Sequence, residues 1–228
     1  TSNTAIKALR HKQAKNAFAI LLLSHGVPML LAGDEFLHSQ QGNNNCYCQD
    51  NELSWLNWAD SKQNADILRF VQQMIQLRKR HASLMRRNFL TGAMLEHRGI
   101  ADITWHGLTP NQPPEWNNSE NRFLAYTLAG LDAEDSDLHV VMNMSNDKHS
   151  LHLPNIADRT WCLAVDTSLK APHDIIPSEL QKPLKKPVYN VDSRSVVVFE
   201  NIENRLLNDA SPGFFSKLAH MKIFDLNE

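Results

Sequence analysis

The strongest constraint in this sequence is one continuous apolar run at residues 27–33, placed directly after a predicted helix. Apolar side chains at helical spacing indicate that the helix begins near residue 4, and Gly26 is well placed to end it. An apolar run without alternation is typical of a strand buried on both faces of a parallel sheet. One such strand cannot form a sheet, so we expect its neighbours to lie outside this sequence.

The second half of the chain has a different pattern. From about residue 89, short β-type runs alternate with turn residues, which is typical of an antiparallel β-sandwich. The runs cover residues 103–105, 123–128, 138–144, 150–153, 160–165, 188–191 and 195–199. A second amphipathic helix, ending near residue 81, precedes them.

These patterns predict the fold class and three regions. Residues 1–88 are predicted to be an α/β fragment, the last βα unit of a larger domain. Residues 89–201 are predicted to be an all-β antiparallel sandwich that folds by itself, and residues 202–228 a tail with a candidate short helix at 214–221. Because the first region lacks its neighbours, we expect it to leave apolar side chains uncovered, and then to self-associate, to rearrange into helical packing against the sandwich, or to remain mobile. The side chains expected to be exposed are Leu30, Leu31, Ile67, Val71 and Met74.

Composition excludes several classes of protein. The 228 residues are 42% hydrophobic and 21% charged, which is ordinary for a globular chain and excludes disorder throughout. A net charge of −2 provides no basic excess for a nucleic-acid backbone, and the longest apolar run, at residues 17–23, is too short to span a bilayer. Three cysteines, an odd number, favour a reducing compartment. We therefore expect a cytoplasmic protein with no nucleic-acid or membrane partner.

A polar loop at residues 34–58 is the candidate binding site, because it is dense in amides and aromatic rings. Amides both donate to and accept from sugar hydroxyls, and aromatic faces stack on sugar rings. The candidate substrate-binding residues are Asp34, Glu35, Gln41, Asn43, Asn44, Tyr47 and Asp50. Two alternatives remain open for the amides, namely contact with a sugar and bridging within the loop. Trp58 is expected to pack onto the helix that follows it rather than onto a ligand.

The same loop offers no obvious catalytic or metal chemistry. Asp34 and Glu35 follow the predicted strand, but neighbouring strand residues point to opposite faces, so the two carboxyls cannot flank one glycosidic bond. They either support an active site or bind loop amides. Cys46 and Cys48 lack a second pair of ligands at zinc-site spacing. We expect no metal and no cofactor.

Motifs in both halves resemble the glycogen debranching enzymes, the isoamylase-like members of the α-amylase superfamily. The first half contains GVPMLLAGDEF at residues 26–36, QQGNNN at 40–45, YCQDN at 47–51 and SWLNW at 54–58. The second half contains DITWHG at residues 102–107, Trp116, LAYTL at 124–128, Asn143 and the segment 161–167. The resemblance covers most of residues 5–200.

The resemblance implies a parent enzyme with a (β/α)8 catalytic barrel, of which residues 1–88 would be the C-terminal remnant, followed by a β-sandwich. Such a glycoside hydrolase cleaves α-1,6 branch linkages in glycogen or limit dextrin with retention. Its three catalytic carboxylates follow strands four, five and seven, whereas this sequence would begin after strand seven. The resemblance therefore implies no catalytic residue in this chain, and contact with glycogen or another branched α-glucan only through the parent. Two alternatives remain: a non-catalytic module that binds glucan or a partner, and an inactive split product.

Overall fold

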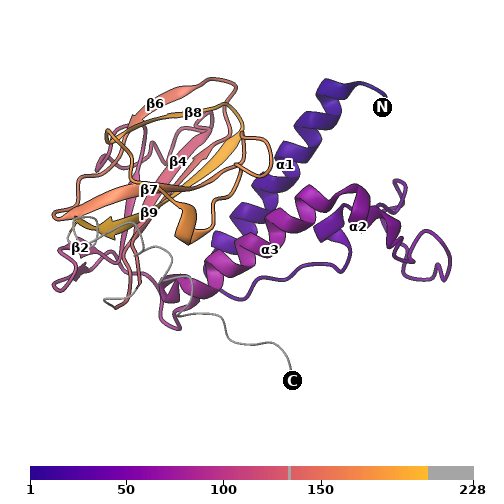
Figure 1. Cartoon of the computed structure of the whole chain (residues 1–228), viewed down its shortest axis with the longest axis horizontal. Helices are drawn as coiled ribbons and strands as arrows, with labels where there is room; N and C mark the ends of the chain where they lie inside the picture. The colour runs from indigo at the N-terminus through magenta and orange to yellow at the C-terminus, as the bar shows by residue number, and fades with distance from the viewer. Residues whose placement is uncertain (133–134, 205–228) are drawn as a thin grey trace.

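The computed structural model describes residues 1–132 and 135–204, in which the predicted β runs pair into antiparallel sheets (Figure 1). A five-stranded sheet has the order β3-β4-β5-β9-β7, and β6 pairs with β8 in a separate two-stranded ribbon. The bounds are β3 (Ile103–His106), β4 (Phe123–Leu128), β5 (Leu138–Asn143), β6 (His149–His152), β7 (Arg159–Asp166), β8 (Val188–Val191) and β9 (Ser195–Glu203). A short hairpin, β1 (Met94–Leu95) with β2 (Ile100–Ala101), precedes them.

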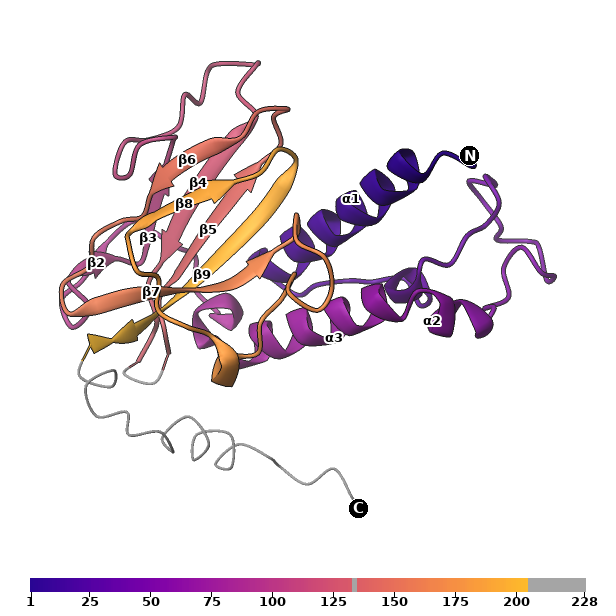
Figure 2. The same ribbon diagram turned by 45° about the horizontal axis from the view of Figure 1, so that its top comes forward.

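The β6–β8 ribbon covers one face of the five-stranded sheet, and helices cover the other (Figure 2). Strand β9 contains a continuous apolar run at residues 196–199, which lies between two cores. Val197 and Phe199 belong to the core beneath the ribbon, while Val196 and Val198 belong to the core beneath the helices. Since successive strand residues point to opposite faces, a strand between two cores needs apolar side chains at both phases. The predicted antiparallel architecture is confirmed.

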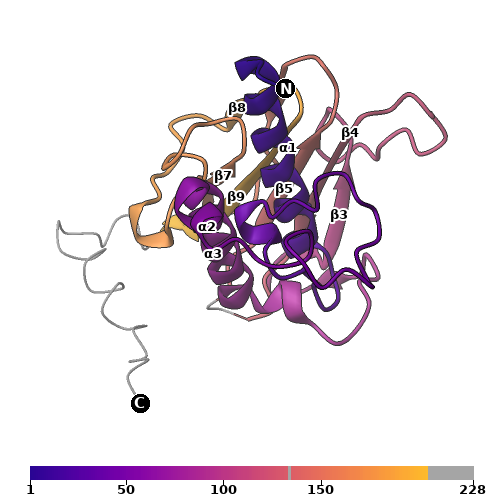
Figure 3. The ribbon, with the colours of Figure 1, turned by 90° about the vertical axis from the view of Figure 1, so that its right-hand side faces the viewer.

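Two helices, α1 (Thr4–Leu23) and α3 (Ala65–Arg80), lie side by side against the sheet (Figure 3). The side chain of Asn3 caps α1 by accepting hydrogen bonds from the backbone N–H groups of Ala5 and Ile6 at 2.9 and 3.2 Å. A short helix, α2 (Ala59–Gln63), precedes α3, so the second predicted helix is divided at Asn64. None of the described helices is long and apolar enough to cross a membrane.

The expected exposure of α3 was wrong. Its apolar side chains Ile67, Val71 and Met74 are fully or almost fully buried, in one cluster with α1 and the sheet. Hydrophobic burial explains the outcome: the exposed stripe of an amphipathic helix gains free energy from any apolar surface within reach, and the sheet offers one. Residues 1–88 and the sheet therefore share a hydrophobic core.

The predicted strand at residues 27–33 is not formed. Val27, Met29 and Leu31 are 96%, 89% and 59% exposed, and no strand pairing involves this segment among the described residues. A strand is stabilised by hydrogen bonds to neighbouring strands, and the described part of the chain contains no parallel partner for this one. We refer to residues 27–31 as the exposed apolar segment. The described structure is thus mostly antiparallel sheet with few helices, and the βα barrel unit predicted for residues 1–88 is not visible as such.

We predict that the exposed apolar segment drives self-association, because contiguous exposed apolar side chains with unpaired backbone favour intermolecular contact. Light scattering at increasing protein concentration should give a mass that rises above that of the monomer. The double variant Val27→Lys/Met29→Lys should remain monomeric, whereas Leu180→Lys, which changes an exposed leucine elsewhere, should behave as the original chain. A monomeric original chain at high concentration would contradict this prediction.

Candidate functional site

The loop at residues 34–58 lies beside α2, at the end of the helical layer that is remote from the sheet (Figure 1). It begins with a short 3-10 turn, η1 (Asp34–Phe36), which follows Gly33 at φ 97°. A side chain at Gly33 would meet Leu56 and His38 at under 3 Å, so glycine is needed for both its backbone angle and its close packing. The buried Phe36 ring and a 3.0 Å hydrogen bond from Asn64 Nδ2 to the Phe36 carbonyl fix the turn on α3.

Three of the candidate residues bond within the loop. Glu35 Oε2 accepts from the Gly33 N–H at 2.8 Å, and the Asn43 side chain accepts from the Asn45 N–H at 2.9 Å. Asp50 accepts from the indole N–H of Trp55 at 2.8 Å. All three side chains bond to neighbouring groups of the chain, which for Asn43 and Glu35 is one of the alternatives that the sequence left open.

The other four candidates lie toward solvent to different degrees. Gln41, Asn44 and Tyr47 are exposed, and the Tyr47 ring is 96% accessible. Asp34 is half-buried, and burial raises the pKa of its carboxyl, with the neighbouring Glu35 raising it further and His38 opposing. The structure does not gather the seven candidates around one centre, and their role in substrate binding remains a prediction.

Trp58 contacts the Phe36 ring, with centroids 5.8 Å apart, and is mostly exposed. It therefore packs at the start of α2 against the turn, rather than onto the length of the following helix. The loop cysteines Cys46 and Cys48 are free thiols, and no group of three potential metal ligands occurs among the described residues. Cys162 lies in the core, and burial raises the pKa of its thiol to about 12.

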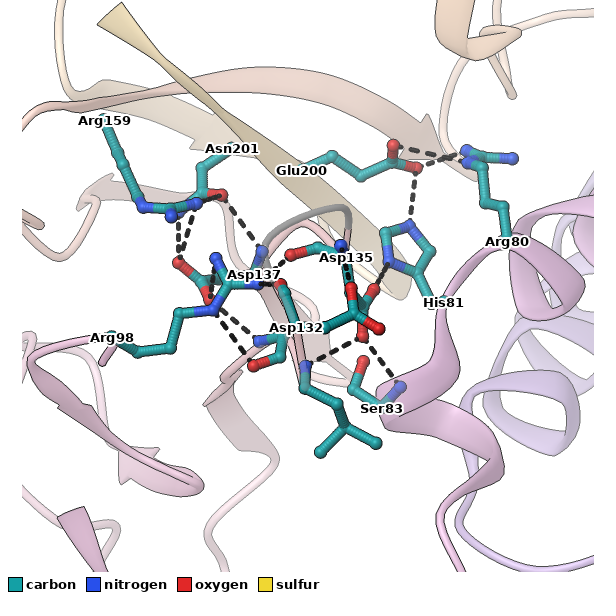
Figure 4. A network of polar contacts seen from close by, with 12 residues as sticks. Arg80, His81, Ser83, Arg98, Asp132, Asp135, Asp137, Arg159, Glu200 and Asn201 are labelled. Atoms are coloured by element: carbon teal, nitrogen blue, oxygen red, sulfur yellow. Dashed lines mark hydrogen bonds and ion pairs between the residues drawn. The ribbon is translucent and has the colours of Figure 1, made fainter. Parts of the chain in front are cut away.

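A second polar constellation lies between the end of α3 and the sheet, and sequence reasoning missed it (Figure 4). His81 Nδ1 lies 2.9 Å from Asp135, which also accepts from the Ser83 N–H at 2.9 Å. Glu200 on β9 pairs with Arg80 and lies 3.5 Å from the other His81 ring nitrogen. Although burial alone would raise the pKa of Glu200, the hydrogen bond from His81 and the charge of Arg80 lower it to about 2.

The rest of this network surrounds Asp137. Its carboxylate accepts from Asn201 Nδ2 at 2.6 Å and lies 3.6 Å from Arg159. The buried Arg98 side chain donates to three backbone carbonyls of the turn before β5, at Gly130, Asp132 and Asp135. Because these charged groups are paired with one another between α3, the turn and the sheet, the network fixes the relative positions of these three elements. Its members come from distant parts of the chain, so no local spacing in the sequence could have indicated it.

Comparison with known proteins identifies a family for the β domain and relatives for a larger part of the chain. Residues 104–202 match the family described as isoamylase 1-3, C-terminal. Isoamylase 1, chloroplastic, of Arabidopsis thaliana is 36% identical over 181 residues, which are 78% of this chain and 22% of that protein. The glycogen operon protein GlgX homolog of Haemophilus influenzae is 36% identical over 141 residues, 62% of this chain and 19% of that protein.

Solved structures agree at the level of the fold. Type I pullulanase from Bacillus subtilis, complexed with maltose, superposes with a TM-score of 0.62 at 22% identity, over 88% of this chain and 24% of that one. The pullulanase from Bacillus acidopullulyticus has the same TM-score at 21% identity, over 87% and 21%. The chain spans about a fifth of the length of the curated relatives that it matches.

Proposed function

The chain belongs to the isoamylase-like debranching enzymes, and from this membership we propose that it supplies their C-terminal β domain together with the last helices of a catalytic barrel. The activity proposed for the whole enzyme is hydrolysis, with retention, of α-1,6-glucosidic branch linkages in glycogen or limit dextrin. The homologous relatives carry the names isoamylase and glycogen operon protein GlgX homolog, which supports this reaction class.

One structural observation carries the barrel part of the proposal. The exposed apolar segment lies between α1 and α3, with its side chains in solvent and its backbone unpaired among the described residues. A helix, an extended apolar segment and a second helix are the parts of a terminal βα unit whose strand would pair with neighbouring barrel strands. The loop at residues 34–58 follows that segment, and in a barrel it would lie at the face where active sites are built.

We predict that this polypeptide alone does not cleave α-1,6 linkages. Retaining glycosidases require two carboxyls about 5 Å apart on either side of the scissile bond. The most promising carboxylates, Asp34 and Glu35, are adjacent in a tight turn, and Glu35 is occupied by the Gly33 N–H. Release of reducing ends from glycogen and limit dextrin should stay at background. Activity that co-purifies with the intact mass of this chain would refute the prediction.

The positive test is a chimera in which this chain replaces the matching part of Arabidopsis isoamylase 1. Debranching of glycogen by the chimera, compared with the unmodified isoamylase, would support the proposal. The matched control carries Val27→Lys and Met29→Lys in the same chimera, and it should lose activity because a barrel strand cannot bury lysine. A chimera that melts cooperatively but does not debranch would count against the proposed function.

A second candidate function is a non-catalytic glucan-binding module. It is favoured by a specific observation, the two exposed tryptophans Trp105 and Trp116 on the sandwich.

A further inference from the structure

We propose that Trp105 and Trp116 form a carbohydrate-binding platform on the sandwich, and that its ligand is a linear stretch of α-glucan. Trp105 lies on β3 and is 40% exposed, while Trp116 lies on the connection from β3 to β4 and is 62% exposed. Their ring centroids are 5.6 Å apart with the planes at 79°. Tyr126, which belongs to the core beneath the helices, packs against Trp105 with the two ring centroids 5.5 Å apart.

The connection that carries Trp116 is held in place at its base. It projects beyond the sheet (Figure 3), yet His106 Nδ1 accepts a 2.8 Å hydrogen bond from the Asn111 N–H. The Gly107 N–H donates to the Gln112 carbonyl at 2.6 Å, and the Trp116 N–H donates to the Pro114 carbonyl at 2.9 Å. A large aromatic side chain held in this way loses little conformational entropy when a ligand binds, so the surface is preorganised.

His106 is itself fixed, since it is buried and its Nε2 lies 2.8 Å from Thr127 Oγ1. Because its Nδ1 accepts from Asn111, the neutral ring carries its proton on Nε2 and donates to the threonine hydroxyl. That hydroxyl in turn donates to Nδ1 of His139 at 2.9 Å. The base of the platform is therefore tied to the core of the sandwich through a continuous chain of hydrogen bonds.

The charges around the platform favour a neutral ligand with hydroxyl groups. The connection at residues 107–122 carries Glu115, Glu120 and a single cation, Arg122, which lies 3.5 Å from Glu120 and is paired with it. A polyanion such as a nucleic acid requires cations at its phosphates, so it does not fit this surface. Carboxylate and amide groups beside Trp116, including the exposed Asn118 that donates to Glu115 at 2.7 Å, match the hydrogen-bonding needs of sugar hydroxyls. Aromatic faces with polar groups beside them suit a pyranose ring, which has apolar faces and a polar edge.

The identification of the sugar as an α-glucan rests on the proposed function, whereas the platform itself rests on the geometry. The platform is formed by β3 and its connection to β4, and the loop at residues 34–58 contributes none of its residues. A glucan held there would be retained by the sandwich without being positioned for hydrolysis by it.

The test is calorimetric titration of the full chain with maltoheptaose, compared with cellohexaose. Trp116→Ala should weaken maltoheptaose binding at least tenfold, and Trp116→Phe should restore part of it. Phe89→Ala, which removes an exposed aromatic ring outside both the platform and the loop at residues 34–58, should leave the affinity unchanged. The melting curve of each variant reports whether the fold is intact, and Trp116→Phe keeps the test valid if the alanine variant is unstable.

Five outcomes decide the matter. Loss of maltoheptaose affinity in a folded Trp116→Ala variant, with Phe89→Ala unaffected, supports the platform. Absence of maltoheptaose binding to the original chain at millimolar concentration overturns it, as does unchanged affinity in the variant. Preference for cellohexaose through Trp116 overturns the choice of α-glucan. Binding through Trp116 together with an inactive, folded isoamylase chimera supports the platform while refuting the proposed function, so the two failures are distinguishable.

Discussion

Lowering the pH from 7 to 5 should destabilise the sandwich by about 2 kcal/mol for each of two buried histidines, at 1.36 kcal/mol per pKa unit. Burial lowers the pKa of His106 to about 4. Burial, assisted by His106, lowers that of His139 to about 3. Both rings are therefore neutral in the folded chain at pH 5, whereas the unfolded chain binds protons below its histidine pKa of about 6.5. The stability that these two neutral histidines contribute is fully present above pH 6.5 and declines as the pH falls toward their pKa values in the folded chain.

Other groups titrate with a different sign or in a different range. Burial lowers the pKa of His81, but the hydrogen bonds to Asp135 and Glu200 outweigh burial and raise it. The stability that His81 contributes to the fold therefore grows as the pH falls. Glu200, with a pKa of about 2, contributes stability that is lost only below about pH 4.5. Between pH 5 and 6.5, the change in the free energy of unfolding is thus the loss from His106 and His139 less the gain from His81.

The measurement is the free energy of unfolding by urea at pH 7, 6 and 5. The double variant His106→Gln/His139→Gln should lose most of the acid-induced decline, because His81 and the carboxylates are the same in both proteins. His25→Gln, which changes an exposed histidine, should keep the original pH dependence. An unchanged decline in the double variant would show that these two rings are not its cause.

Replacing Arg78 by methionine should cost about 2–4 kcal/mol, because two buried carbonyls, those of Leu22 and Leu84, would lose their donor at roughly 1–3 kcal/mol each. The buried guanidinium of Arg78 donates to the carbonyls of Leu22, Ser24 and Leu84 at 2.7, 2.8 and 3.0 Å, and also to that of Gly26. Three of these carbonyls belong to the end of α1 or the residues directly after it, where a helix leaves acceptors without intrahelical donors. Methionine fills part of the space but leaves the acceptors unpaired.

Thermal and urea unfolding of Arg78→Met should show this loss. Lys79→Met, which changes an exposed cation one residue further along α3, should stay within about 0.5 kcal/mol of the original chain. Equal stability of the two variants would mean that water or other groups satisfy the carbonyls in the absence of Arg78.

The strands could be predicted because each one has a local pattern of apolar residues bounded by turn residues. The alternation of turn residues with β-type runs located β3 to β9, since each strand needs apolar side chains facing at least one core. The run at residues 27–33 misled for the converse reason: its composition suits a buried parallel strand, but pairing depends on neighbours that the described chain does not provide.

The candidate sites differ in the same way. The amides and aromatics of the loop at residues 34–58 are visible in the sequence, but which of them bond to each other, as Asp50 does to Trp55, is decided by the local turn. Trp105 and Trp116 were recognised as part of a motif, while their proximity arises only when the connection folds back beside β3. The four carbonyls bound by Arg78 are backbone groups, so the spacing of side chains in the sequence gives no indication of this contact.

The way the loop is attached has a consequence for its length. Asn64, directly before α3, binds the chain at Phe36, so the residues between Phe36 and α2 leave and return near the start of α3. For a flexible excursion between fixed ends, doubling the number of residues costs only about 0.6 kcal/mol of closure entropy. Insertions and deletions between Phe36 and α2 should therefore be accommodated without disturbing either core, which leaves the reach of this loop free to vary while the scaffold that carries it stays the same.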